Sequence, residues 1–87
     1  MSDDELAYYE RIRGRLDSGE YSVATVHAQL ATARAPEERE ALRLTLIGNY
    51  ASAVAQTEKL RPPTQEAQDI KKRLLDVLDN IMKVLTL

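Results

Sequence analysis

The stretch from Ile70 to Leu87 carries the strongest helical pattern in the chain. On a helical wheel its apolar side chains fall on one side, and Leu75 and Met82 widen that side to about half the circumference. A single neighbouring helix cannot cover an apolar side this wide, so we expect the rest of the chain, or a partner, to pack on it. The narrower stripe consists of Ile70, Leu74, Val77, Leu78, Ile81, Val84 and Leu85.

The segment from Pro36 to Leu60 has a second broad apolar side. Pro36 suits the first position of a helix, and acidic residues follow it where the helix dipole favours them. Pro62-Pro63 ends this helix, because proline lacks the amide donor and pushes the preceding residue out of helical geometry. Thr64 is then predicted to cap a fourth helix. Since the two long helices match in length across a short break, we expect an antiparallel hairpin.

Two shorter helices are predicted before this hairpin. The first runs from Asp3 to about Leu16, and the turn signature Asp17-Ser18-Gly19 ends it. The second begins near Ser22, which can cap it, and ends near Arg34-Ala35. At about 13 residues it is too short to be stable alone, so tertiary contacts must hold it. The pattern therefore predicts an all-α fold: a small four-helix bundle in which two short N-terminal helices precede a long antiparallel helical hairpin.

Composition agrees with this fold. The chain has 87 residues, 44% hydrophobic and 30% charged, which is typical of one folded domain, and we expect residues 1–87 to form a single helical domain. Phe and Trp are absent, so the core must be built from Leu, Ile, Val and Ala. The start of the chain is acidic, unlike a signal peptide, and no apolar run reaches the roughly 18 residues of a membrane span. These features favour a cytoplasmic protein.

Residues for catalysis or metal binding are scarce. The chain contains no cysteine and one histidine, His27, which we place at the edge of the core. Asp76 and Asp79 lie one turn apart, but beside Lys and Arg on a helix surface such carboxylates form ordinary helix pairs. Glycine-rich phosphate loops and metal motifs are also missing. We therefore expect no enzyme, no catalytic residue, no cofactor and no metal.

One short segment points to an alternative function. Residues 22–30 read SVATVHAQL and resemble the recognition helix of bacterial helix-turn-helix repressors, which often read S-x-x-T-V-x-x-x-L. The resemblance covers about nine residues and implies a DNA-binding regulator that uses the Ser22–Arg34 helix, with Thr25, His27 and Gln29 at base edges and Arg34 on phosphate. The net charge of −2 and the lack of Lys or Arg before Arg34 in this helix disfavour nucleic acid as the main partner.

Basic residues form two clusters in the sequence, residues 11–15 and 71–73. Successive helical residues point in different directions, so neither cluster is expected to make a dense basic patch. We predict that both clusters, Arg11, Arg13 and Arg15 and separately Lys71, Lys72 and Arg73, are solvated and paired with acidic residues. The expected partners are Glu10, Asp17, Asp69 and Asp76.

The excess of apolar surface is the remaining signal, and it favours a non-catalytic protein-binding module that acts through an apolar helix face. The partner is a second copy, giving a homodimer, or a larger target protein, as for an adaptor, a chaperone-like protein or an inhibitor. The edge formed by Leu75 and Met82 is the part that the short helices are expected to leave uncovered. The predicted protein-binding residues are Tyr50, Leu74, Leu75, Leu78, Ile81, Met82 and Leu85.

Overall fold

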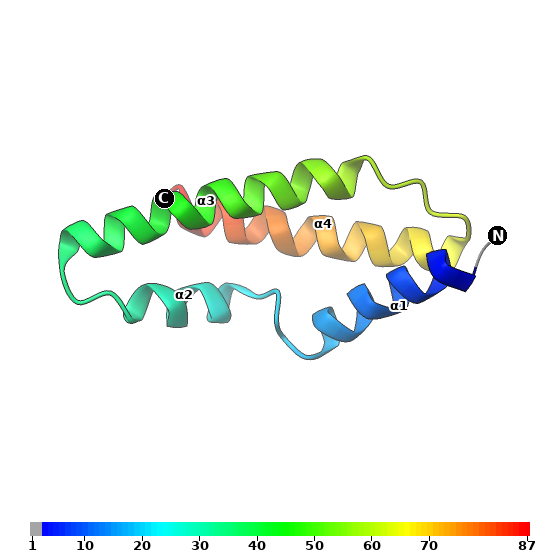
Figure 1. Cartoon of the computed structure of the whole chain (residues 1–87), viewed down its shortest axis with the longest axis horizontal. Helices are drawn as coiled ribbons and strands as arrows, with labels where there is room; N and C mark the ends of the chain where they lie inside the picture. The colour runs from blue at the N-terminus through cyan, green and yellow to red at the C-terminus, as the bar shows by residue number, and fades with distance from the viewer. Residues whose placement is uncertain (1–2) are drawn as a thin grey trace.

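The computed structural model describes residues 3–87, which form four α-helices and no strand. The helices are α1 (Asp3–Asp17), α2 (Val23–Ala31), α3 (Pro36–Glu58) and α4 (Gln65–Leu85). Figure 1 shows α3 and α4 side by side, with α1 and α2 following one another along one side of this pair. The molecule is elongated, at 49 × 22 × 18 Å. The predicted all-α class is confirmed.

The helix starts predicted at Ser22 and Thr64 are confirmed by side-chain caps. The Ser22 hydroxyl accepts a hydrogen bond from the Thr25 amide at 3.1 Å, and the Thr64 hydroxyl accepts one from the Ala67 amide at 3.1 Å. Each bond satisfies an amide that has no partner within the helix. The predicted turn after α1 is also present, and Gly19 lies in the left-handed region there, with a φ of 80°.

Two helices end earlier than the sequence pattern predicts. Helix α2 has 9 residues and stops at Ala31, with Thr32 as its C-cap, and Ala35 is extended (φ −110°, ψ 149°), as the residue before Pro36 should be. Helix α3 stops at Glu58, ahead of the proline pair. The Lys71 ammonium donates to the carbonyls of Glu58 at 3.1 Å and Leu60 at 2.8 Å, which satisfies carbonyls that the helix end leaves open.

Two clusters of buried side chains lie along α4. The first cluster joins α1 to the N-terminal part of α4 through Tyr9, Ile12, Leu16, Ala67, Ile70, Leu74 and Leu78. The second cluster joins α2 and α3 to the C-terminal part through Val26, Leu30, Leu46, Ile81 and Leu85. Tyr50 and Val77 are partly buried and pack against both clusters. The apolar stripe predicted on α4 thus contributes to both core clusters.

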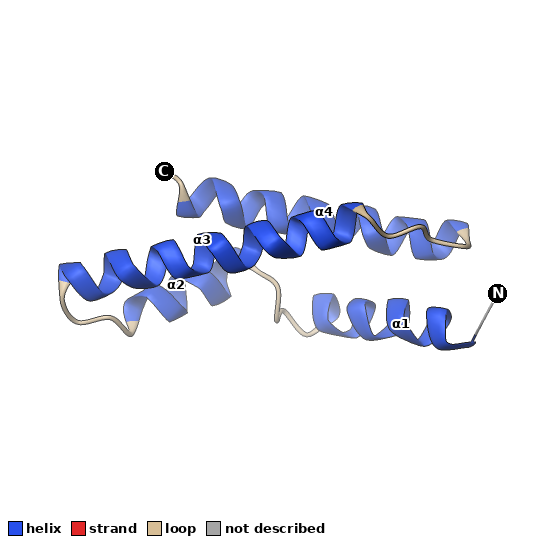
Figure 2. Cartoon of the chain, turned by 45° about the horizontal axis from the view of Figure 1, so that its top comes forward, coloured by secondary structure: helices blue, strands red, loops and turns tan. Residues whose placement is uncertain are grey.

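The two short helices are held differently. Helix α2 packs against both α3 and α4, whereas α1 packs against α4 and does not reach α3. Figures 1 and 2 agree in placing α1 apart from α3. Exposed ion pairs add to the contact of α1 with α4, Arg13 with Glu66 at 2.9 Å and Arg73 with Asp17 at 2.7 Å. No helix between residues 3 and 87 is long and apolar enough to cross a bilayer.

Candidate functional site

The structure places four of the predicted binding residues in the core. Leu74, Leu78, Ile81 and Leu85 are 6%, 0%, 0% and 1% exposed. Their side chains hold the helices together and offer no surface to a partner in this conformation. They were expected at the binding face because they belong to the same wide apolar side as Leu75 and Met82. The protein-binding surface of α4 therefore excludes these four residues.

Tyr50, which was also predicted to bind a partner, does not lie on the apolar face predicted for binding. It is partly buried between the two core clusters. Burial raises the pKa of its hydroxyl, and the nearby Tyr21 and Glu20 raise this pKa further. Tyr50 therefore belongs to the junction of the clusters rather than to an open binding face.

Leu75 and Met82 remain at the surface, where they line a groove of about 410 Å³ between α3 and α4. We call this hollow the α3–α4 groove. Neither α1 nor α2 contributes a lining residue, so the short helices leave this edge open. The other residues of the groove are Ala51, Val54, Glu58, Asp76 and Asp79.

The groove combines an apolar wall with acidic side chains. Glu58, Asp76 and Asp79 are all exposed. Asp79 pairs with Lys83 at 3.2 Å, and the structure shows no ion pair of Glu58 or Asp76 with any of residues 3–87. Such a surface complements a ligand that carries an apolar stripe with cations beside it.

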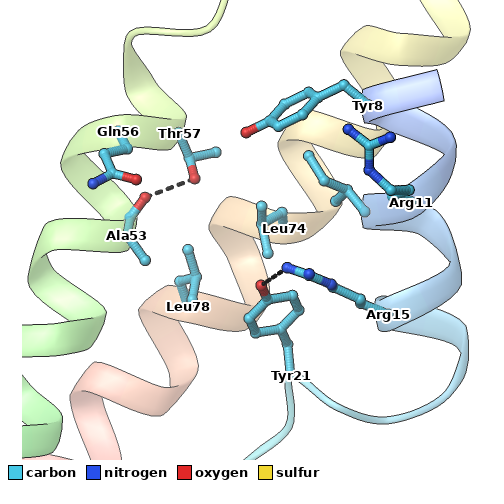
Figure 3. Close-up of a pocket in the computed structure, with 10 residues that line it drawn as sticks. Tyr8, Arg11, Arg15, Tyr21, Ala53, Gln56, Thr57, Leu74 and Leu78 are labelled. Carbon is cyan, nitrogen blue, oxygen red and sulfur yellow. Dashed lines mark hydrogen bonds between the residues drawn. The ribbon is translucent and has the colours of Figure 1, made fainter. Parts of the chain in front are cut away.

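A second hollow, of about 320 Å³, lies where α1 fails to reach α3. We call it the arginine cleft, and Figure 3 shows it between α1 and α3, with α4 as its floor. The floor is apolar, the α1 wall carries Arg11 and Arg15, and polar groups of α3 lie opposite. The lining residues are Tyr8, Arg11, Ile12, Arg15, Tyr21, Ala53, Gln56, Thr57, Leu74 and Leu78.

The two arginines of the cleft differ in their partners. Arg15 donates from Nη1 to the Tyr21 hydroxyl at 3.2 Å, as Figure 3 shows, and lies 3.6 Å from Glu20. This hydrogen bond to the Tyr21 oxygen is the main reason that the pKa of Arg15 is raised. Arg11 is exposed and forms no ion pair within residues 3–87. Its guanidinium is therefore available to an anion.

The predicted pairing of the basic clusters is confirmed in part. Arg13 pairs with Glu10, whereas Asp17 pairs with Arg73 from α4. The sequence interpretation missed that Arg11 and Arg15 lie one turn apart, with Tyr8 one turn before them. Residues spaced by three and four share one face of a helix. That spacing was the available signal for the cleft wall.

His27 is exposed on α2 and not at the core edge where the sequence placed it. Between residues 3 and 87 no group of three or more His, Asp or Glu residues is placed to hold a metal ion.

The geometry of α1 and α2 differs from a helix-turn-helix unit. In that motif the first helix packs across the recognition helix, but α1 and α2 make no such contact here. The Thr25 hydroxyl donates to the Gly19 carbonyl at 2.9 Å and also bonds to Ser22, so it is not free to face a base. His27, Gln29 and Arg34 are exposed.

Comparison of the chain with protein-family models, with curated proteins and with solved structures finds no match. The candidate binding sites are therefore the two hollows, the α3–α4 groove and the arginine cleft.

Proposed function

We propose that the chain is a non-catalytic protein-binding module: a four-helix bundle whose long antiparallel hairpin, α3–α4, presents the α3–α4 groove to a partner. The proposed occupant is an amphipathic helix of another protein, with an apolar stripe flanked by Lys or Arg. The observation that carries this proposal is the open groove, which has Leu75 and Met82 in its wall and three carboxylates beside them.

The chemistry of the groove suits a helix better than a flat surface. Helices bind such grooves through side chains spaced by three, four and seven residues, which match a groove that runs between two parallel cylinders. Ala51 is small and lets a helix approach α3 closely, while the flexible thioether of Met82 adapts to the side chain opposite. Burial of one leucine-sized side chain contributes about 1.5–3 kcal/mol.

The negative charge of the groove determines which amphipathic helices bind it. Glu58 and Asp76 have no cationic partner in residues 3–87, so a basic helix gains their attraction without breaking an existing pair. Rim charges of this kind affect the association rate and the salt dependence more than the final affinity. An acidic helix of the same shape would be repelled. Holding a helical segment of a target in a groove is one way in which an adaptor, a chaperone-like protein or an inhibitor acts.

The proposal is tested with a synthetic helix as the probe. A labelled peptide of about 18 residues, roughly 27 Å long as a helix, carries Leu on one side and Lys on the other. We expect saturable binding in a fluorescence anisotropy titration, and a weakening of about ten- to hundredfold when Leu75 and Met82 are both changed to Glu. Leu6→Glu is the matched control, because Leu6 is 40% exposed on α1, away from the groove.

Two outcomes contradict the proposal. One is equal binding of the wild-type chain and the Leu75→Glu/Met82→Glu variant. The other is a dimer in sedimentation equilibrium that this variant dissociates, because a second copy would then occupy the groove. A monomer that binds the Lys peptide and not a Glu peptide of the same pattern is the expected result.

A further inference from the structure

We propose that the arginine cleft is a separate ligand site, which takes a small amphipathic carboxylate: an apolar body on the floor of the cleft and an anionic head at Arg11 and Arg15. This inference does not depend on the proposed function, since the cleft shares no lining residue with the α3–α4 groove.

The floor of the cleft provides a preformed apolar surface. Ile12, Leu74 and Leu78 beneath it are 7%, 6% and 0% exposed, so core packing fixes the floor without a ligand, and the apolar surface that stays accessible above them includes the rings of Tyr8 and Tyr21. Ala53 continues this surface toward α3. A preformed site loses little conformational entropy when it binds.

The head of the ligand meets donors on the α1 side. Arg11 has no ion pair in residues 3–87, and a guanidinium offers five N–H groups in a plane that matches a carboxylate. Arg15 donates one N–H to the Tyr21 oxygen, and this hydrogen bond holds the Arg15 guanidinium at the cleft (Figure 3). The Tyr21 oxygen accepts that bond, so its own hydrogen is free to donate to the ligand.

The size of the cleft limits the ligand. At about 30 Å³ for each non-hydrogen atom, the volume that a water molecule takes in the liquid, 320 Å³ holds roughly ten such atoms. This is the lower end of the range for ligand pockets. Both arginines are exposed and Glu20 lies 3.6 Å from Arg15, so screening and an internal competitor will keep the affinity modest.

Octanoate has the required size and chemistry and serves as the probe. We expect its titration to shift the amide resonances of the cleft in a saturable way, around Arg11 and Arg15 on α1 and around Ala53 and Thr57 on α3. Octanol and octylammonium, which share its apolar body, are expected to bind at least fivefold more weakly. A second experiment compares two short leucine peptides, one with a free and one with an amidated C-terminus. This comparison shows whether the carboxylate that binds belongs to a peptide or to a free acid such as octanoate.

Variants test the role of the arginines. An exposed ion pair is worth up to about 1 kcal/mol, so Arg11→Ala and Arg15→Ala should each weaken octanoate binding by up to about fivefold. Both side chains are exposed, so the fold should survive, which circular dichroism checks. Arg39→Ala is the matched control, because Arg39 is exposed on α3 outside the cleft. Equal binding of octanoate and octanol, or full binding by the Arg11→Ala/Arg15→Ala double variant, would overturn the proposal.

Discussion

The two hollows of this molecule lie on different faces of the same helix and are built in opposite ways. The arginine cleft has core residues for its floor, Leu74 and Leu78, and a basic wall. The α3–α4 groove has partly exposed residues in its wall, Leu75 and Met82, and an acidic rim. Helix α4 thus uses one row of apolar side chains to fold the chain and the adjacent row to face outward. Substitutions in the two rows should therefore have different effects on folding and on ligand binding.

The largest expected effect is on folding. Leu78→Ala should lower the free energy of unfolding by about 2–5 kcal/mol, because it leaves a cavity between α1 and α4. Leu75→Ala should cost clearly less, under about 1.5 kcal/mol, because its side chain is only partly buried. Urea unfolding followed by circular dichroism measures both. Equal losses in the two variants would mean that the two rows of α4 do not differ in role.

The next largest effect is on ligand binding. Substitutions that change the charge of one hollow should change the affinity of that hollow and not of the other. Asp76→Lys combined with Glu58→Lys should weaken the Lys peptide about tenfold and leave octanoate binding unchanged. Arg11→Ala combined with Arg15→Ala should do the reverse. Titration of both variants with both probes is the measurement. A change in both affinities in either variant would show that the hollows are coupled.

The cleft side should also open more readily than the groove side. Helix α1 packs against α4 alone, whereas α2 and α3 share the second cluster with it. The two ion pairs that join α1 to α4 are exposed, and each contributes no more than about 1 kcal/mol. Amide hydrogen exchange should therefore be faster in α1 than in the middle of α3 and α4. Equal protection in α1 and α4 would contradict this account of α1.

The smallest effect is expected at alkaline pH. Burial raises the pKa of Tyr9 in the first cluster above its usual value near 10, so the folded state holds this proton more tightly than the unfolded state does. Stability is then unaffected by this group below about pH 10 and falls as the pH rises toward the folded pKa. Tyr9→Phe should reduce that loss most, and Tyr8→Phe only slightly, because burial is the largest cause of the raised pKa of Tyr9 and the neighbouring Tyr8 a smaller one. Thermal unfolding between neutral and alkaline pH measures the difference, and identical alkaline losses in wild type and Tyr9→Phe would argue against burial as the cause.

Much of the fold was predictable because its signals are local. Ser22, Pro36 and Thr64 mark helix starts by backbone chemistry alone, and the proline pair marks the end of α3 to within a few residues. The site was less predictable. Periodicity identifies Leu74, Leu75, Leu78 and Met82 as one apolar side, but only the placement of α1 and α2 decides which of them is covered. The cleft was missed because it lies between two helices that do not pack together, and the spacing of Tyr8, Arg11 and Arg15 marks only one of its walls.

The proposed role of the α3–α4 groove can be tested through a single side-chain methyl group, that of Met82. Met82 is the only methionine after Met1, so with labelled methionine methyl groups its resonance reports directly on the groove. Titration with the Lys peptide should shift the Met82 methyl resonance to saturation, at the same dissociation constant that anisotropy gives, and titration with the Glu peptide should not. Peptide binding that leaves the Met82 methyl unshifted would place the binding surface elsewhere and contradict the account.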